Sequence, residues 1–449
     1  MEKVRELLRH LQDPHLVARF QHVCGVRSGA ADRAHSLNNG ACMQRVSDSG
    51  DSDAPAVTGS GEGQKVPAGV RRKVAEPRGA SEDPRQNGAA VSEVISAGEP
   101  LHGAPAAGRS STVKPLRKNS LTGDAGQEFL IQNRFLYYLF TFGTELGNES
   151  FYITFFPFIM WNVDAFVSRR LIMVWVWVMF LGQCTKDLLG WSRPASPPVV
   201  KVEMFYNSEY SMPSTHAMSG TAIPFSLFFM TYGRWEYPST LGFCLALCWC
   251  LLVCSSRIYM GMHSVLDVIA GFLYSVLILL LFLPALDTLD GFNLTSRLAP
   301  PVIVALHLGL GAFSFTLDAW STSRGDTAQI LGSGAGVALA SHVNHRLGLM
   351  ADHPAERLPL AVPALSAGLV GGALLRLALG VLVLVATRAL MKAVTIPLAC
   401  RAFGVPGGDV RKARQHVEVE LPYRYLVYGT MGFNVLFLVP LLFRYLQLS

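Results

Sequence analysis

Charged residues are scarce in this sequence of 449 residues. Asp, Glu, Lys and Arg together make up 16% of it, whereas soluble domains usually contain about 25%. Hydrophobic residues make up 50% of the chain, and each helix that crosses a bilayer needs about 20 mostly apolar residues. This composition does not fit a soluble enzyme, and it predicts a protein that crosses a membrane several times.

The sequence also lacks paired cysteines. Four of its eight cysteines, Cys244, Cys248, Cys250 and Cys254, crowd into one apolar run, without the spacing of a zinc site or a disulfide framework. We interpret them as buried, reduced thiols that behave as small apolar residues, and we expect no cofactor. The net charge of +6 does not predict nucleic-acid binding either, because much of the basic excess lies in the N-terminal segment.

Aromatic residues are almost absent from residues 21–126, which are rich in Gly, Ala, Ser, Pro and charge. Such a segment cannot bury enough apolar area to offset its conformational entropy, so we predict that it is disordered. Residues 1–20 have the pattern of a short amphipathic helix, which contacts a membrane surface, is solvated or binds a partner. We assign residues 127–290 to a catalytic membrane core with three polar motifs, and residues 291–449 to additional transmembrane helices.

Apolar runs of membrane-spanning length recur from about Phe135 onward. They predict an all-α fold, a polytopic membrane helix bundle with about 8–10 spans. The number of spans is given as a range because the run from Phe135 to Val163 could hold one tilted helix, or a re-entrant piece followed by a helix. The small residues from Gly332 to Gly336 predict close helix packing, because they open a run of small residues rather than follow a strand.

The first two polar motifs stand on either side of a loop. Lys186 and Arg193 are seven residues apart at the end of an apolar run, so we expect them to share one helix face. After the loop, Ser214 or Thr215 is placed to cap the next helix, whose N-terminus offers free backbone NH groups to an anion. His216 then lies in the first helical turn. A purely structural role is the simpler alternative: the two cations would lie at the membrane interface, and Ser214 or Thr215 would cap the helix. That alternative does not explain the histidine.

The third motif joins the end of one apolar run to the start of the next. It contains Arg257, His263 and Asp267. Asp267 follows His263 by four residues, so on a helix the carboxylate could hold the distal NH of the imidazole. A surface His–Asp pair is the simpler alternative, but an acidic side chain inside an apolar membrane helix is costly without a purpose.

The number of helices between the motifs places all three at one membrane face. The chain crosses the membrane an even number of times between one motif and the next, so it returns to the same side each time. Together they supply three cations, a helix N-terminus, two histidines and a carboxylate. These groups suit a phosphate dianion. They do not favour a metal, since there is no carboxylate cluster or close histidine pair, and nearby cations would repel the ion.

At these residues the sequence resembles the type-2 phosphatidic acid phosphatase superfamily. The signature of that superfamily is Lys, six residues, Arg-Pro; then Pro-Ser-Xaa-His; then Ser-Arg, five residues, His, three residues, Asp, and every element is present here. The wider stretch, including Phe205 to Pro213 and Tyr259 to His263, looks more particularly like the sphingosine-1-phosphate phosphatases. The resemblance implies a six-helix phosphatase core in a metal-independent phosphoric monoester hydrolase. It also implies a substrate that is a phosphorylated sphingoid base, held among membrane lipids.

The resemblance also implies a role for each motif residue. His263 attacks phosphorus to form a phosphohistidine, and Asp267 orients its ring. His216 protonates the leaving alkoxide and later activates water. The phosphate is bound by five residues, Lys186, Arg193, Ser214, Thr215 and Arg257.

Two alternative functions stay open. One is a phosphatase for another lipid phosphate, a polyprenyl phosphate or a sugar phosphate, which the motifs do not distinguish. The other is a transporter or lipid-binding protein with a vestigial site, against which the complete motifs argue. The resemblance places the chain in the endoplasmic reticulum membrane as a multi-pass protein. Short loops on the opposite face carry Arg169, Arg170 and Arg234, so the positive-inside tendency predicts a lumenal catalytic face.

Overall fold

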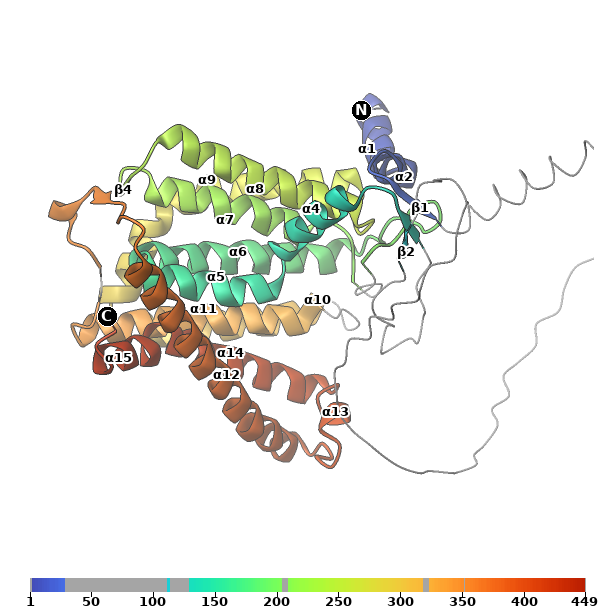
Figure 1. The fold of residues 1–449 in the computed structure, drawn as a ribbon. Helices are drawn as coiled ribbons and strands as arrows, with labels where there is room; N and C mark the ends of the chain where they lie inside the picture. The colour runs from blue at the N-terminus through green and yellow to red at the C-terminus, as the bar shows by residue number, and fades with distance from the viewer. Residues whose placement is uncertain are drawn as a thin grey trace, which may run out of the picture. The chain divides into compact units, whose positions relative to one another are not determined.

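The structure is a computed structural model that describes residues 2–28, 111–113, 129–203, 209–317, 323–350 and 352–448. Within these ranges nearly all regular secondary structure is helical, and long helices run side by side in a bundle (Figure 1). The prediction of an all-α membrane helix bundle is therefore confirmed. Most of the segment 21–126, which we predict to be disordered, lies outside the described residues.

The bundle is built from long helices with a few short strands at its ends. The helices are α1 (Glu2–Gln12), α2 (Pro14–Val23), α4 (Arg134–Glu145), α5 (Glu149–Asn162), α6 (Ala165–Leu189), α7 (Thr215–Thr231), α8 (Ser239–Tyr259), α9 (Val265–Thr295), α10 (Ala299–Leu317), α11 (Ser323–Arg346), the 3-10 helix η1 (Ala355–Arg357), α12 (Ala367–Phe403), α13 (Val410–Ala413), α14 (Val417–Leu436) and α15 (Leu438–Tyr445). The strands are β1 (Val26–Ser28), β2 (Ser111–Val113), β3 (Phe129–Ile131), β4 (Trp235–Glu236) and β5 (Leu360–Ala361). Strand β3 pairs antiparallel with both β1 and β2, and β4 pairs parallel with β5.

Six segments of the described chain are long and apolar enough to cross a membrane. They are α6, α8, α9, α10, α12 and the stretch Val417–Tyr445, which contains α14 and α15. Helices α5 and α7, with 14 and 17 residues, and the less apolar α11 run beside them in the same bundle (Figure 1).

The N-terminal segment differs from the prediction of one helix over residues 1–20. Asp13 ends α1 and caps α2 by accepting a hydrogen bond from the His15 amide at 2.9 Å, a role that Asp favours at a helix start. Helix α2 then continues to Val23. The buried Gln21 side chain donates to the carbonyl oxygens of Val200 and Tyr259 at 2.6 and 2.9 Å. Residues 21–28 are therefore ordered and held against the bundle, so the predicted boundary at residue 21 is wrong.

Small residues bring α11 and α14 into backbone contact, as the sequence predicts. A Cβ atom added to Gly332 would lie 2.5 Å from the Tyr425 carbonyl oxygen, and one added to Gly432 would lie 2.6 Å from that of Ser333. A Cβ atom on Gly336 would overlap the Gly429 carbonyl. This contact holds α14 against the centre of the bundle.

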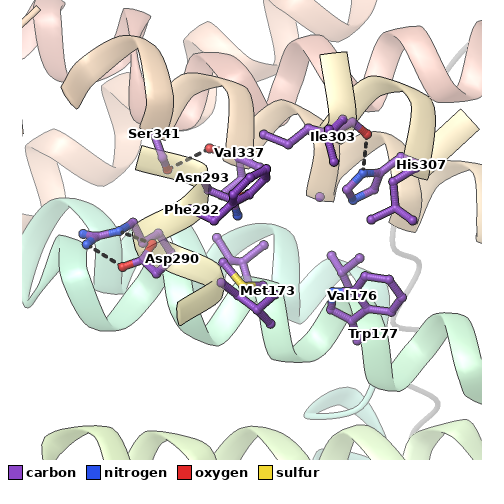
Figure 2. Close-up of a pocket in the computed structure, with 17 residues that line it drawn as sticks. Met173, Val176, Trp177, Asp290, Phe292, Asn293, Ile303, His307, Val337 and Ser341 are labelled. Atoms are coloured by element: carbon purple, nitrogen blue, oxygen red, sulfur yellow. Dashed lines mark hydrogen bonds and ion pairs between the residues drawn. The ribbon is translucent and has the colours of Figure 1, made fainter. Parts of the chain in front are cut away.

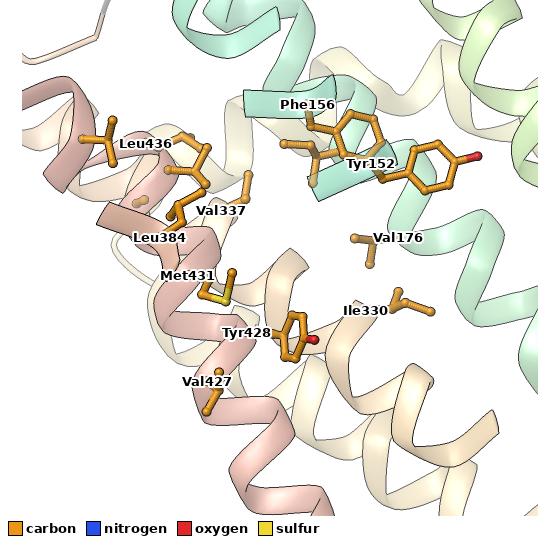
Figure 3. Close-up of a cluster of buried hydrophobic side chains, with 14 of the residues drawn as sticks. Tyr152, Phe156, Val176, Ile330, Val337, Leu384, Val427, Tyr428, Met431 and Leu436 are labelled. Atoms are coloured by element: carbon orange, nitrogen blue, oxygen red, sulfur yellow. The ribbon is translucent and has the colours of Figure 1, made fainter. Parts of the chain in front are cut away.

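A core of aromatic and aliphatic side chains surrounds this contact. It includes side chains of α5, α6, α11, α12 and α14 (Figure 3), and α7, α13 and α15 also contribute to it. Phe156 of α5, Val176 of α6 and Leu384 of α12 are each at most 5% exposed. The helices that follow α9 in the chain are therefore packed into the same core as the helices that precede it.

Ion pairs close the bundle at the start of α6. Arg169 is 2.9 Å from Asp290 and 2.6 Å from Asp352, and Arg170 also contacts Asp290, at 2.9 Å. Arg169 and Asp290 border a cavity of about 160 Å³ between α6, α9, α10 and α11 (Figure 2). Carboxylates thus neutralise Arg169 and Arg170, two of the three arginines from which we predict that the face opposite the motifs is cytosolic.

Replacing Gly336 with Ala should destabilise the protein by about 1–3 kcal/mol, because the added methyl group would overpack a helix contact. Gly371 lies in α12, where an added Cβ atom would have no other atom within 4 Å, so Gly371→Ala is the matched control. We expect the control to be neutral or slightly stabilising, since Ala favours helices over Gly. Thermal unfolding in one detergent measures both, and equal effects of the two substitutions would contradict this account of the packing.

Candidate active site

The three polar motifs meet in one cavity of about 430 Å³ inside the bundle. Six of the eight predicted site residues line it: Lys186, Arg193, Thr215, His216, Arg257 and His263. Ser214 and Asp267 are buried beside the cavity. Ser214 caps α7, where its hydroxyl accepts a hydrogen bond from the Ala217 amide at 3.4 Å. The structure thus brings together residues from three separate stretches of the sequence.

Lys186 and Arg193 converge without sharing a helix. Helix α6 ends at Leu189 because Gly190 adopts a left-handed conformation with φ of 60°, so Arg193 lies in the segment that follows. Both side chains contact Glu209, with Oε2 at 3.5 Å from Lys186 Nζ and at 3.4 Å from Arg193 Nη2. The expected shared helix face is therefore wrong, but the expected convergence of the two cations is present.

Arg257 lies in the last turn of α8 and is 1% exposed. Its Nη1 donates to Glu203 at 2.9 Å. Its buried Nε has no hydrogen-bond partner among the described residues. A buried donor without a partner is costly, so this nitrogen is suited to an oxygen of a bound anion. Glu203 and Glu209 come from the loop between the first two motifs, and only their charge in a short loop could have indicated this role.

His263 occupies the turn between α8 and α9 rather than a helix. Ser264 caps α9, and the Asp267 carboxylate closes the capping box by accepting from the Ser264 amide at 2.7 Å. The His263 Nδ1 atom is 3.9 Å from Asp267 Oδ2, which is too long for a hydrogen bond. The expected i, i+4 pair on a helix is wrong, because the residue before an N-cap has non-helical geometry.

Ser211 lies between the two side chains. Its hydroxyl donates to Asp267 Oδ2 at 2.6 Å, and its Oγ is 3.4 Å from His263 Nδ1. The carboxylate therefore acts on the imidazole through Ser211. Because Nδ1 faces this serine, Nε2 is the ring nitrogen left free of this contact.

The environment of His263 favours the neutral form of its ring. Burial holds the pKa of this histidine well below its usual value, and the nearby cations Arg193 and Arg257 lower it further. At neutral pH the imidazole therefore keeps an unprotonated nitrogen.

His216 lies in the first turn of α7 and lines the cavity. Its Nε2 is 3.1 Å from Asn148 Oδ1. The Asn148 amide nitrogen donates to Glu145 at 3.0 Å, so its oxygen accepts and the hydrogen lies on His216 Nε2. Asn148 thereby fixes the tautomer of His216, a role that the sequence did not reveal.

The arrangement has the charge pattern of a phosphate site rather than a metal site. Within the described ranges, no group of three or more His, Cys, Asp or Glu side chains is placed to hold a metal ion. Three cations and two histidines line one cavity, and the Arg257 Nε has no hydrogen-bond partner among the described residues.

Comparison with known proteins agrees with this pattern. A family profile described as the PAP2 superfamily matches residues 154–289. Proteins named sphingosine-1-phosphate phosphatase 1 from Rattus norvegicus and Mus musculus are each 52% identical over 456 residues, covering 100% of this chain and 99% of the relative. Sphingosine-1-phosphate phosphatase 2 from Homo sapiens is 36% identical over 448 residues, covering 99% of both chains. No solved structure matches the chain.

The chain belongs to the PAP2 superfamily, whose profile spans the stretch that holds the motifs. Within that superfamily it belongs with the sphingosine-1-phosphate phosphatases, which it matches over nearly their full length.

Ser211→Ala should lower kcat for phosphate release by about 10- to 100-fold, the usual range for losing a hydrogen bond to a charged group, with little change in KM. Ser211→Thr keeps the hydroxyl and should restore much of the loss. Ser275→Ala is the control, because this buried hydroxyl donates to a backbone carbonyl, that of Met218, at 3.0 Å. Normal turnover in Ser211→Ala would show that Asp267 does not act through the serine.

Proposed function

We propose that this protein is an integral membrane phosphatase that hydrolyses sphingosine-1-phosphate and related phosphorylated sphingoid bases through a phosphohistidine intermediate. The observation that carries the proposal is the cavity itself, which joins a cationic end with two histidines to a long apolar end. A substrate that fills it must carry both a phosphate and a hydrocarbon chain. The names of the full-length relatives support the sphingoid base as that substrate.

One face of α6 follows the cavity along its length. Lys186, Gln183, Met179 and Ile172 all line it, at spacings that repeat every three, four or seven residues and so share a face. From Lys186 to Ile172 the helix rises about 21 Å. One leaflet of a bilayer core is about 15 Å deep, so the cavity has room for an extended hydrocarbon chain.

In the first chemical step, His263 Nε2 attacks phosphorus and the bond from phosphorus to the alkyl oxygen breaks. Lys186 and Arg257 neutralise charge on the phosphoryl oxygens. The bound phosphate dianion favours a protonated His216. Its Nδ1 gives a proton to the leaving alkoxide, which departs as an alcohol, while the hydrogen on Nε2 stays with Asn148. The positive charge that develops on His263 is stabilised by Asp267 through Ser211.

In the second step, water breaks the bond between phosphorus and nitrogen. His216, now without its proton, accepts a proton from the water molecule as the oxygen attacks phosphorus. Phosphate leaves, and both histidines return to their starting forms. The cations of the site perform the charge neutralisation, so we propose that no metal ion is needed.

We also propose that the protein resides in the endoplasmic reticulum membrane with its catalytic pocket on the lumenal side. The family resemblance supports the compartment. The cations Arg169, Arg170 and Arg234, at the opposite end of the bundle, support the orientation by the positive-inside tendency.

Purified protein should release phosphate from sphingosine-1-phosphate and dihydrosphingosine-1-phosphate faster than from lysophosphatidate, phosphatidate, a polyprenyl phosphate or glucose-6-phosphate. Excess EDTA should leave the rate unchanged, vanadate should inhibit it, and His263→Ala should abolish it. Equal rates on the glycerol lipids would contradict the sphingoid substrate. No release from any of these phosphates would favour a transporter or lipid-binding protein with a vestigial site.

Replacing His216 with Ala should lower turnover of an alkyl phosphate by about 10²- to 10⁴-fold, the usual contribution of general acid–base catalysis. With p-nitrophenyl phosphate, whose leaving group needs no proton, the variant should still form phosphohistidine and hydrolyse it slowly. The phosphoenzyme should therefore accumulate in a rapid-quench trap. His307→Ala, a buried histidine outside this cavity, is the control. Near-normal turnover in His216→Ala would contradict the assignment.

A further inference from the structure

Gln183 is a buried polar side chain in the wall of the catalytic cavity. It is 4% exposed, and its Oε1 has no hydrogen-bond partner among the described residues. Lys186 follows it by three residues on the same face of α6, about 4.5 Å further along the axis. Because a buried acceptor without a partner costs free energy, this amide is suited to a polar group of the substrate close to the phosphate.

Asp326 faces the same cavity from the first turn of α11. Its Oδ1 accepts from Gln329 Nε2 at 3.1 Å and from Arg424 Nη1 at 3.4 Å. The only other carboxylate in the described lining is Glu209, and that group contacts Lys186 and Arg193. Asp326 instead pairs with Arg424, and its side chain is 42% exposed.

The cavity changes character in a fixed order along its length. Along α6 the lining passes from Lys186 through Gln183 to the apolar Met179 and Ile172, and Asp326 lines the same cavity, near enough to Lys186 for the two charges to interact. In a phosphorylated sphingoid base the phosphate is on the first carbon, an ammonium and a hydroxyl group are on the second and third carbons, and the hydrocarbon chain follows. The order of groups along α6, from a cation through an amide to apolar side chains, corresponds to the order of groups in this substrate.

The apolar part of the cavity depends on the helices that follow α9. Its wall includes Val337 of α11, Leu384 of α12 and Met431 of α14 (Figure 3). The same helices carry Asp326 and its partner Arg424. The C-terminal third of the chain thus supplies Asp326 and part of the apolar wall.

We infer that Gln183 and Asp326 form a subsite for the ammonium and hydroxyl groups of the substrate, an inference that rests on the proposed function. The Asp326 carboxylate pairs with the ammonium group, and the Gln183 amide oxygen accepts a hydrogen bond from the ammonium or hydroxyl group. This subsite distinguishes sphingoid bases from single-chain phosphates that lack an amine.

The test measures kcat/KM on three single-chain substrates: sphingosine-1-phosphate, its N-acetyl derivative, and an unsubstituted long-chain alkyl phosphate. Gln183→Leu and Asp326→Asn should each lower kcat/KM for sphingosine-1-phosphate about 10- to 100-fold more than for the alkyl phosphate. For Asp326→Asn, the preference for the free amine over the N-acetyl derivative should also fall. Asp287→Asn removes a carboxylate at the far end of α9, where it pairs with Arg170 at 2.6 Å, and should change none of these values.

The alkyl phosphate reports folding and the chemical step, so a misfolded variant is recognised by equal losses on all substrates. If both variants lose activity equally on all three, measured on protein that unfolds at the wild-type temperature, the subsite is overturned. It is also overturned if the wild-type preference survives both substitutions, while the proposed function stands. If the wild type shows no preference for sphingosine-1-phosphate over the alkyl phosphate, the proposed function fails and the subsite fails with it.

Discussion

The structure depends on holding three cations together inside a membrane protein. Lys186, Arg193 and Arg257 are almost wholly buried in one cavity, and like charges in a medium of low dielectric constant repel strongly. Without a substrate, the carboxylates of Glu203 and Glu209 offset that repulsion. A phosphate dianion supplies the same two negative charges, so a substrate can replace these contacts while the site keeps its charge balance.

The positions of the helix ends follow from this requirement. Gly190 stops α6 just after Lys186, Ser214 starts α7, and Ser264 starts α9. Each motif is therefore held by backbone that is already fixed by a cap or a left-handed turn, which keeps the reacting groups in place before substrate arrives. The contact between α11 and α14 completes the cavity from the other side. The candidate active site from the middle of the chain and the apolar wall that α11, α12 and α14 help to form thus share one core.

Much of the site could be predicted from the sequence because its residues lie at the ends of apolar runs. The number of runs between the motifs shows that all of them lie on the same side of the membrane. The residues that escaped prediction are brought in by tertiary packing. Asn148 comes from the start of α5 and Ser211 from a loop, and no spacing connects either to its histidine. The prediction for His263 and Asp267 was wrong because a four-residue spacing is a contact only within a helix. Gln183 did carry a signal, as a lone amide in an apolar run, but only the fold shows which cavity it lines.

The most direct test of the account is an experimental structure of the protein with orthovanadate, which mimics phosphorus during transfer. The account predicts vanadium bonded to His263 Nε2, His216 facing the opposite apical oxygen, and the carboxylate of Glu209 displaced from Lys186 and Arg193. Vanadium bonded to His216, or bound while Glu209 still bridges the two cations, would contradict it.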